Sequence, residues 1–417
     1  MRKSKKKKKK IKISAILAFV VLCIIIGLLI HFIIVKIEDS KVLPQGEPIV
    51  KDKKETKKDT KKEYKLSLVM VGDYLIHSSV YEDANKNANY NGYDFKPMIS
   101  LIKDYIKKNN YDLAYYNQET IIGGTEIGLS TYPAFNSPDE AADAMLDAGF
   151  NMVSLATNHT LDRGEKAINH SCEYWNSKKD VLSAGSYCSE EQRAEERIFE
   201  KNNIKYTMLN YTYGTNGIPV PNGKDYLVNI WPTEGNNPEN DTNYQAYKET
   251  VLNDINKVRD KVDVLIVAMH WGVEYTHTPT AYQKDMAKFL ADNGVDIVIG
   301  THPHVVEPIE YIDDTLVIYS LGNFISGQDN DINYAKLVGL LTSIDITKTV
   351  DKDETSIKLD NLNNDLLFTY YEAKHNFKVV PFSIITDEYL SDYTTLYDKY
   401  SAVIKQIDET IPVMGVN

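Results

Sequence analysis

The 417-residue sequence predicts an α/β protein whose body follows a single membrane-spanning helix. Three observations lead to this prediction. Short apolar runs, typical of strands buried on both faces, recur along the body. Helical stretches with recognisable ends separate most of these runs. A longer apolar run near the N-terminus has the length needed to cross a bilayer.

This long run, residues 13–35, is interrupted only by Ser14, Gly27 and His31. As a helix it would be about 34 Å long, slightly more than the roughly 30 Å hydrocarbon core of a membrane. A cleaved signal peptide is the alternative, but its apolar region would be shorter and a small-residue cleavage site would follow. We therefore expect an uncleaved, single-pass anchor in the cell membrane.

Charged residues are distributed unevenly along the chain, which indicates that its parts lie in different surroundings. Residues 1–12 carry nine basic side chains and no acid, which predicts a cytoplasmic tail and an extracytoplasmic body. Residues 36–64 are rich in Lys, Glu and Asp without apolar periodicity, which is typical of a flexible stalk. Residues 66–417 contain 28 basic and 52 acidic residues, so nucleic acid is excluded as a partner. Cys172 and Cys188 could pair outside the cytoplasm, but their spacing does not show it.

The main domain is expected at residues 65–346. Its apolar runs, interpreted as strands, are Leu66–Val71, Asp112–Tyr116, Met152–Ala156, Val262–Met269 and Asp296–Ile299. A helix should start at Pro138, with Ser137 as N-cap and Glu140 completing a capping box. A second capping box is readable from Asp162 to Glu165, and a third helix should cover residues 281–293.

The alternation of strands and helices ends after Gly322, and antiparallel strands are expected from there on. Residues 347–417 are expected to form C-terminal strands and a helix that complete the fold. The predicted elements are strands Lys336–Ile346, Ser356–Asp360, Leu366–Glu372 and Phe377–Ile385, followed by a helix near Glu388–Ile407.

Potential metal ligands stand where the apolar runs end. They are Asp73, Asn117 with Glu119, Asn158 with His159, His270, and His302 with His304. Because open α/β sheets bind ligands at the carboxyl ends of their strands, we expect these side chains to converge. Carboxylate, amide and imidazole ligands without a thiolate favour a catalytic metal over a structural zinc site. Two ions about 3.5–4 Å apart could share a carboxylate there.

Simpler interpretations exist for single residues. Asp73 could be a turn acid, Asn158 could cap a turn, and Asp162 suits a helix N-cap better than a catalytic role. His77, four residues beyond Asp73, is interpreted as a loop histidine. His170, His277 and His375 have no partners in the sequence and are interpreted as structural.

Six motifs occur in order over residues 66–326. They are Val71-Gly72-Asp73, Asn117-x-Glu119, Asn158-His159-x-x-Asp162-x-Gly164, His270-Trp271-Gly272-x-Glu274-Tyr275, Gly300-x-His302-Pro303-His304-x-x-x-Pro308-x-Glu310 and Tyr319-Ser320-Leu321-Gly322-Asn323-Phe324. As a set they resemble the CapA family of poly-γ-glutamate capsule synthesis proteins, which are similar to calcineurin-type metallophosphoesterases. The resemblance implies a four-layer α-β-β-α sandwich of metallophosphoesterase type, with one or two divalent metal ions (Mn, Zn or Fe) at the carboxyl edges of two central sheets.

The resemblance also implies roles for single residues. The implied metal ligands are Asp73, Glu119, Asn158, His270, His302 and His304. His159 matches the general acid, Asp162 is the second catalytic candidate, and the substrate-binding candidates are Trp271, Glu274 and Asn323. The sequence departs from the related metallophosphoesterases at two positions. Asp73-Tyr74-Leu75 lacks the histidine of their Asp-x-His motif, and Glu119 replaces their bridging aspartate.

Three functions are compatible with these features. The leading hypothesis is a membrane-anchored protein in the synthesis or export of an anionic surface polymer, poly-γ-glutamate above all, with other membrane components of a synthesis complex as partners. The second is an active metal-dependent hydrolase of phosphoesters or amide bonds in wall or capsule material. The third is a metal-free binding module. A nucleophile elbow and a P-loop are both missing from the sequence.

Overall fold

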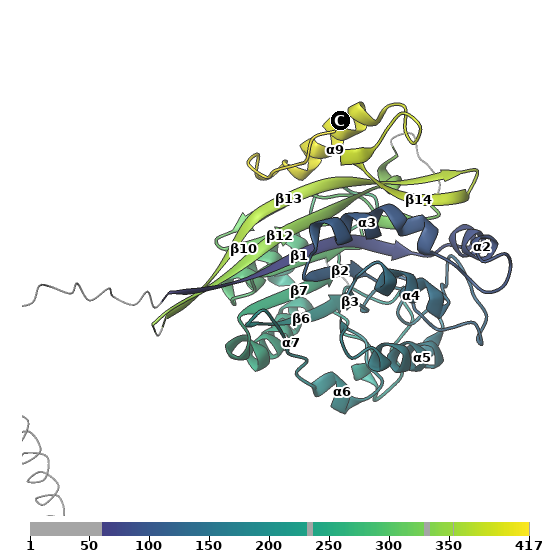
Figure 1. Ribbon diagram of the computed structural model, residues 1–417. Helices are drawn as coiled ribbons and strands as arrows, with labels where there is room; N and C mark the ends of the chain where they lie inside the picture. Colours follow the sequence, from purple (N-terminus) through teal and green to yellow (C-terminus); the bar gives the residue numbers. More distant parts are fainter. Residues whose placement is uncertain (1–60, 232–236, 329–333, 353, 417) are drawn as a thin grey trace, which may run out of the picture. The chain divides into compact units, whose positions relative to one another are not determined.

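Two β-sheets lie at the centre of the protein, and helices cover their outer sides (Figure 1). The computed structural model describes residues 61–231, 237–328, 334–352 and 354–416. The expected α/β class is confirmed, because parallel strands alternate with helices along most of the chain.

The larger sheet has the strand order β14-β13-β12-β1-β2-β3-β4, and β11 also pairs with β1. Strands β1, β2, β3, β4 and β11 are parallel, whereas β12, β13 and β14 add an antiparallel half. The strands are β1 Lys62–Leu75, β2 Leu113–Asn117, β3 Met152–Ser154, β4 Leu182–Ala184, β11 Asn323–Ser326, β12 Val338–Asp351, β13 Glu354–Glu372 and β14 His375–Pro381.

The smaller sheet has the order β5-β6-β7-β8-β10-β9, with four parallel strands between two antiparallel edge strands. Its strands are β5 Phe199–Lys201, β6 Ile204–Thr212, β7 Val264–His270, β8 Ile297–Thr301, β9 Ile309–Ile312 and β10 Thr315–Ile318.

Alternating side chains of the central strands build a helix–sheet–sheet–helix stack. On β1, Leu68 and Met70 join one apolar cluster with side chains of the smaller sheet, whereas Val69 and Val71 face helices. Strand β7 alternates in the same way between the larger sheet and its own helices. Successive side chains of a strand point to opposite faces, so each buried strand joins two layers.

The helices divide between the two outer faces. Helices α2 Ser78–Asn87, α3 Ser100–Asn109, α4 Asp139–Asp147 and α5 Gly164–Ser177 lie on the larger sheet's side, and α7 Thr242–Val258 and α8 Ala281–Asp292 cover the smaller sheet. A short helix, α6 Glu190–Ala194, lies between β4 and β5. Cys172 on α5 and Cys188 form a disulfide, so the pairing that the sequence left open does occur.

Two predicted helix caps are wrong. Helix α4 has Pro138 at its N-cap without a side-chain cap, because the Ser137 hydroxyl instead shares a 2.7 Å hydrogen bond with buried Thr120. Helix α5 begins at Gly164, and Asp162 does not cap it. The capping box that does form is at α8, between Thr280 and Gln283.

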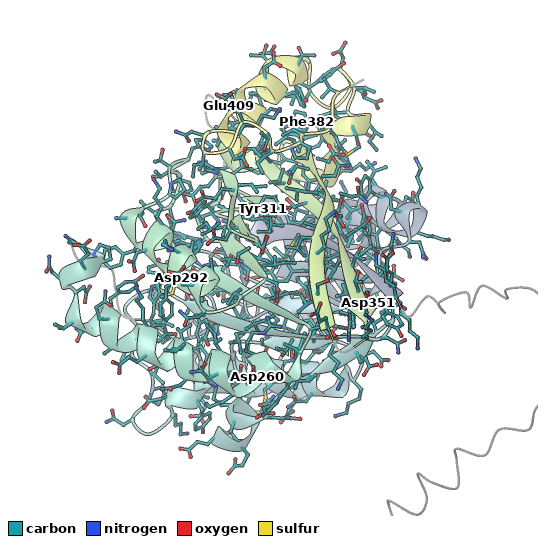
Figure 2. All side chains as sticks on the ribbon, turned by 90° about the vertical axis from the view of Figure 1, so that its left-hand side faces the viewer. Asp260, Asp292, Tyr311, Asp351, Phe382 and Glu409 are labelled. Carbon is teal, nitrogen blue, oxygen red and sulfur yellow. A yellow bond between two sulfur atoms is a disulfide. The ribbon has the colours of Figure 1, made fainter. Side chains whose placement is uncertain are left out.

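The C-terminal part belongs to the same compact unit as the main domain. Strand β12 crosses the expected boundary at residue 346, and β13 joins two predicted strands into one of 19 residues. Helix α9, Tyr393–Ile404, is shorter than predicted. Phe382 and Glu409 lie in this C-terminal layer at one end of the unit (Figure 2).

The predicted cytoplasmic tail and membrane anchor lie outside the described residues. Within the described part of the chain, no helix combines the length and apolarity that a membrane crossing requires. Residues 62–64, expected in the stalk, instead begin β1, where Tyr64 pairs with Lys348 of β12.

Candidate functional site

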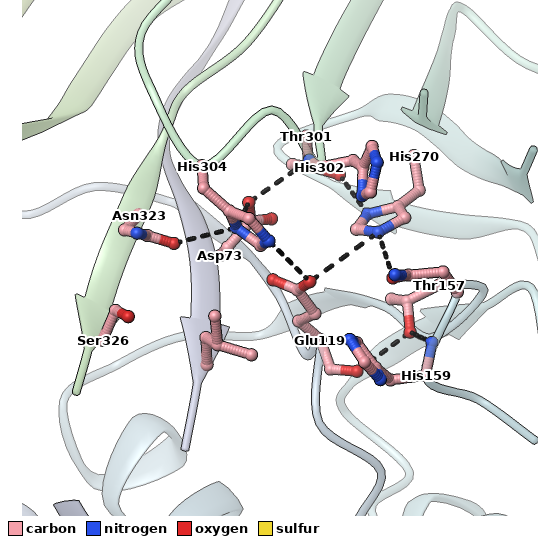
Figure 3. A network of polar contacts seen from close by, with 12 residues as sticks. Asp73, Glu119, Thr157, His159, His270, Thr301, His302, His304, Asn323 and Ser326 are labelled. Carbon is pink, nitrogen blue, oxygen red and sulfur yellow. Dashed lines mark hydrogen bonds and ion pairs between the residues drawn. The ribbon is translucent and has the colours of Figure 1, made fainter. Parts of the chain in front are cut away.

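Loops and strand ends from both sheets converge at the carboxyl ends of β1, β2, β3, β7 and β8 (Figure 3). Asp73 on β1 lies in register with Asn117 on β2 and with Asn323 on β11. The backbones approach closely at this point, since a Cβ on Gly72 would stand 1.8 Å from the carbonyl oxygen of Gly322. Glycine at position 72 therefore lets β1 deliver Asp73 into the centre of the site.

Asp73 is fully buried and held by three groups. Its Oδ1 accepts a 2.8 Å hydrogen bond from the Asn117 amide, and its Oδ2 accepts one of 3.2 Å from the backbone N–H of His302. The same Oδ2 lies 3.2 Å from Nδ1 of His304. The turn-acid interpretation of Asp73 is therefore insufficient, because the carboxylate joins segments more than 200 residues apart.

Glu119 lies between two histidines at the centre of the site (Figure 3). Its Oε1 is 3.5 Å from Nε2 of His304 and 3.9 Å from Nε2 of His270. Neither carboxylate oxygen has a hydrogen-bond partner among the described residues, although the side chain is fully buried. Burial raises the pKa of Glu119 well above its usual value, and the nearby His304 opposes that shift.

His304 is the charged partner of these acids. Burial lowers its pKa, but the carboxylates of Glu119 and Asp73 outweigh that effect and raise it to about 9. A proton on His304 then offsets part of the negative charge of the two acids. A metal ion needs the deprotonated ligand, so cation binding and this proton exclude each other.

His270 and His302 have the opposite electrostatics. Burial, reinforced by the neighbouring histidines, lowers the pKa of both well below the usual range, so they are neutral. His270 Nε2 faces Oδ1 of Asn158 at 2.9 Å, and its Nδ1 faces the hydroxyl of Thr301 at 3.0 Å. Within the described chain, Nδ1 of His302 is buried without a hydrogen-bond partner. Neutral imidazoles with available nitrogen atoms are the form that binds metals.

The backbone of the His302-Pro303-His304 segment is unusual. His302 has φ of 97° and His304 has φ of 59°, both in the left-handed region that non-glycine residues seldom adopt. Such conformations cluster at ligand sites, where the surrounding structure supports them. Figure 3 shows the His304 imidazole directed towards the two acids and the His302 imidazole beside the ring of His270, with ring centroids 4.8 Å apart.

The donor atoms fit one or two divalent cations. Two groups share Glu119: one adds His270 and His302, the other adds Asp73 and His304, and within each group the ligand atoms lie within 4.8 Å of one another. A buried carboxylate without hydrogen bonds costs several kcal/mol unless a cation compensates it. The unpaired oxygens of Glu119 and the unpaired nitrogen of His302 are the atoms that a cation would satisfy.

His159 and Asp162 form a separate pair beside this cluster. Nδ1 of His159 is 2.6 Å from Oδ2 of Asp162, which also accepts a 2.6 Å hydrogen bond from the backbone of Phe135. The ring of Phe135 packs edge-on against His159, with ring centroids 4.7 Å apart. Asp162 therefore orients His159 and does not serve as a helix N-cap.

The three predicted substrate-binding residues differ in position. Trp271 is fully buried in the apolar core of the smaller sheet, and its indole N–H donates to the carbonyl of Tyr319, so it packs beneath the site. Asn323 is also buried and lies 3.1 Å from Nδ1 of His304, which it positions. Glu274 is exposed at the mouth of the site. Together with His302 and His304 it forms a third group of residues that could bind a metal ion.

Several residues of the site carry no clear signal in the sequence. Asn216 bridges Asn158 and His159 at 3.1 and 3.2 Å, and it lies in a long loop without periodicity. Tyr213 and Tyr275 place their rings 4.5 and 5.9 Å from those of His302 and His304. Tyr275 belongs to a motif used in the sequence analysis, whereas nothing in the sequence distinguishes Tyr213 from many other tyrosines.

The site residues fall within a known family region. A family model described as "Bacterial capsule synthesis protein PGA_cap" matches residues 67–328. The chain is 28% identical to PGA biosynthesis protein CapA of Bacillus subtilis (strain 168) over 265 residues, which are 63% of this chain and 64% of that protein. It is 26% identical to Capsule biosynthesis protein CapA of Bacillus anthracis over 277 residues, 63% of this chain and 60% of that protein. The matched region thus spans less than two thirds of each relative.

Two solved structures are similar at low identity. One is described as "GAP50 the anchor in the inner membrane complex of Plasmodium", with 9% identity, a TM-score of 0.29, and coverage of 85% of this chain and 98% of that chain. The other is the 5'-nucleotidase from Candida albicans SC5314, with 10% identity, a TM-score of 0.39, and coverage of 82% and 58%.

Proposed function

Because the chain belongs to the PGA_cap family of bacterial capsule synthesis proteins, we propose that it acts in the synthesis or export of an anionic surface polymer, poly-γ-glutamate above all. The observation that carries the proposal is the buried cluster around Glu119, which lies within the matched residues 67–328. A cluster with unpaired buried carboxylate oxygens destabilises the fold unless a ligand compensates it, so it marks a functional site.

In this proposal the fold is of metallophosphoesterase type and its centre holds one or two divalent ions. The ligands would be Asp73, Glu119, Asn158, His270, His302 and His304. When bound, the ions would stabilise negative charge that develops on a substrate oxygen. The chain itself contributes the orientation of these ligands through Asn117, Thr301 and Asn323.

We also propose a single-pass membrane anchor and an extracytoplasmic body. The apolar run at residues 13–35 and the basic residues before it support this topology. The disulfide between Cys172 and Cys188 supports it independently, because disulfides persist mainly in oxidising compartments.

An acidic body needs a local cation to bind an anionic polymer, and Lys336 is the candidate. Its Nζ lies 5.5 Å from the ring centroid of Tyr275, whose ring is 5.9 Å from that of His304. Salt largely screens the repulsion between the acidic body and an anionic polymer at distances beyond about 8–10 Å. A lysine this close to the site can therefore outweigh the distant acidic residues in the local electrostatic potential. Lys336 would thus contact a carboxylate of the polymer at the mouth.

Deletion of the gene, followed by quantification of surface polymer, tests the role. We expect the polymer to be lost, to be restored by the wild-type gene, and not to be restored by the Glu119→Gln variant. Glu126→Gln is the matched control, because Glu126 follows the same strand but is exposed. Unchanged polymer in the deletion strain would refute the proposal.

A metal-dependent hydrolase is the second candidate function. The pair of His159 and Asp162 favours it, because a carboxylate 2.6 Å from Nδ1 fixes the orientation of the imidazole, as in catalytic histidine–carboxylate pairs. Nε2 of His159 would then protonate a leaving oxygen or nitrogen. The edge of Phe135 against the ring shields this pair from water.

Turnover assays separate the two candidates. Purified full-length chain with added Mn²⁺ or Zn²⁺ would be incubated with bis-p-nitrophenyl phosphate and with poly-γ-glutamate. A hydrolase should lose roughly 10²–10⁴-fold in rate on His159→Ala, the usual contribution of a general acid. His170→Ala is the control, since His170 pairs with Asp139 on the helical side of the larger sheet. An undetectable rate rejects hydrolysis, and a rate unchanged by His159→Ala rejects His159 as the general acid.

A further inference from the structure

A groove rich in tyrosine lies along β13 and β14, outside the Glu119 cluster. Two cavities, of 360 and 430 Å³, meet at the side chains of Tyr370 and Tyr389, which line both. These two rings lie edge to face, with centroids 5.2 Å apart and planes at 84°. Each volume falls within the roughly 300–1,000 Å³ of known ligand pockets.

The first cavity has aromatic walls. Its lining includes Phe368 and four tyrosines: Tyr334, Tyr370, Tyr371 and Tyr389. The tyrosines are partly buried, so the core supports each ring from one side and leaves the other side accessible. A tyrosine held in this way presents a flat apolar face with a polar edge, to which the C–H faces of a sugar ring are complementary.

The second cavity supplies polar groups. Asp83, Asn87, Asn376, Lys378 and Glu388 are among its lining residues. Asp83 is 1% exposed; one of its carboxylate oxygens accepts a 2.9 Å hydrogen bond from the backbone of Phe377, and the other has no hydrogen-bond partner in the described part of the chain. An unpaired buried acceptor at a cavity wall is a position for a hydroxyl donor.

Charge excludes one other class of ligand. The two cavities together have four carboxylates, on Asp83, Glu372, Asp387 and Glu388, against the single cation of Lys378, so a polyanion is repelled. Two of the carboxylates already accept hydrogen bonds from the chain, Glu372 from Tyr370 and Asn376, and Asp83 from the backbone of Phe377. The aromatic faces, hydroxyls and amides of the lining suit an uncharged ligand, and a basic peptide is the competing occupant that the test below includes.

We infer that this groove binds an uncharged oligosaccharide, whose sugar rings stack on Tyr370 and Tyr389. The groove borders the metal-ligand cluster: the Tyr371 hydroxyl donates to the carbonyl of Gln328, whose side chain donates to the hydroxyl of Tyr275. A bound glycan therefore lies beside the site mouth. The inference goes beyond the proposed function and does not depend on it, because the groove contains none of the candidate metal ligands.

Calorimetric titration of the full-length chain in detergent tests the inference. The probes are two uncharged tetrasaccharides, cellotetraose and chitotetraose, together with tetragalacturonate and tetralysine as charged comparisons. At least one uncharged probe should bind saturably. Tyr370→Ala and Tyr389→Ala should each weaken this binding roughly tenfold through the loss of a stacking face, whereas Tyr389→Phe should retain it.

Two controls separate the groove from the rest of the molecule. Tyr226→Ala removes a partly buried tyrosine from a different, 690 Å³ cavity and should leave binding unchanged. Glu119→Gln should also leave it unchanged, so a failure of the proposed function does not affect this test. The inference is overturned if neither uncharged probe binds at millimolar concentration, if both alanine variants bind like the wild type, or if a charged probe binds more tightly.

Discussion

Two buried carboxylates, Asp254 and Glu119, have opposite surroundings. Asp254 on α7 is 4% exposed, and its oxygens accept hydrogen bonds from Arg193, Lys257 and Tyr211. Glu119 is 0% exposed, yet its nearest ionisable partners are two histidines at 3.5 and 3.9 Å, and no described residue donates a hydrogen bond to it. The first carboxylate is paired with an arginine and a lysine, whereas in the second cluster a proton on His304 offsets only part of the negative charge of the acids.

A carboxylate buried for stability and one buried for ligand binding differ in whether the chain itself supplies the compensating cations. Burying a carboxylate costs several kcal/mol, and the chain offsets that cost at Asp254 with its own cations. At Glu119 the ligand atoms converge on a carboxylate that His304 neutralises only in part, and a divalent ion would replace that proton and compensate both acids. We therefore expect Asp254 to act on stability and Glu119 to act on metal binding.

The largest expected effect is at Asp254. Burial raises its pKa, but the hydrogen bonds from Arg193 and Lys257 outweigh this and hold the pKa below its usual value. Asp254→Asn should lower the free energy of unfolding by about 3 kcal/mol, because it leaves a partly buried arginine without its anion. Urea denaturation measures this change. The matched control is Asp292→Asn, which removes an exposed ion pair with Lys288 and should leave the midpoint unchanged.

The same comparison predicts the pH dependence of Asp254. A carboxyl group whose pKa is lower in the folded state stabilises the protein at any pH above its pKa in the unfolded state. This contribution is lost as the pH falls below about 4. The wild type should therefore lose stability relative to Asp254→Asn in acid. An Asp254→Asn variant as stable as the wild type at neutral pH would show that the cluster contributes nothing.

A smaller effect of opposite sign is expected at Asp365 on β13, a buried carboxylate that accepts hydrogen bonds from the neutral Ser383 and has no ion pair among the described residues. Burial raises its pKa to about 6, although hydrogen bonds from Ser383 oppose the shift. A raised folded pKa means that the folded state binds more protons between about pH 4 and 6, so stability increases on acidification. From pH 7 to about 4.5, the wild type should gain roughly 2 kcal/mol relative to Asp365→Asn. A difference that is constant with pH would contradict this account.

The strand ends of the site were predictable because buried parallel strands have distinctive sequences. Asp73, His270 and His302 come directly after such runs, and all three lie in the cluster. The helix caps at Ser137 and Asp162 were not predictable, because their hydrogen bonds to Thr120 and Phe135 depend on tertiary structure. A local capping pattern competes with partners that only the folded chain brings close.

The residues that orient the ligands were harder to find. Asn216 lies in a loop without periodicity, and its contacts with Asn158 and His159 are tertiary. Trp271 stands in a motif beside His270, but strand alternation turns it into the core. Proximity in sequence to a ligand therefore did not indicate whether a side chain faces the site or the core.

Metal titration of the full-length chain after chelation measures whether the Glu119 cluster binds a divalent ion. We predict that the wild type binds one or two Mn²⁺ or Zn²⁺ ions per chain, and that an ion at 100 times its Kd raises the free energy of unfolding by about 2.7 kcal/mol. Glu119→Gln should lose both effects, whereas Glu126→Gln, with an exposed carboxylate, should keep them. Stoichiometric metal binding that survives Glu119→Gln, or its absence from the wild type, would contradict the account.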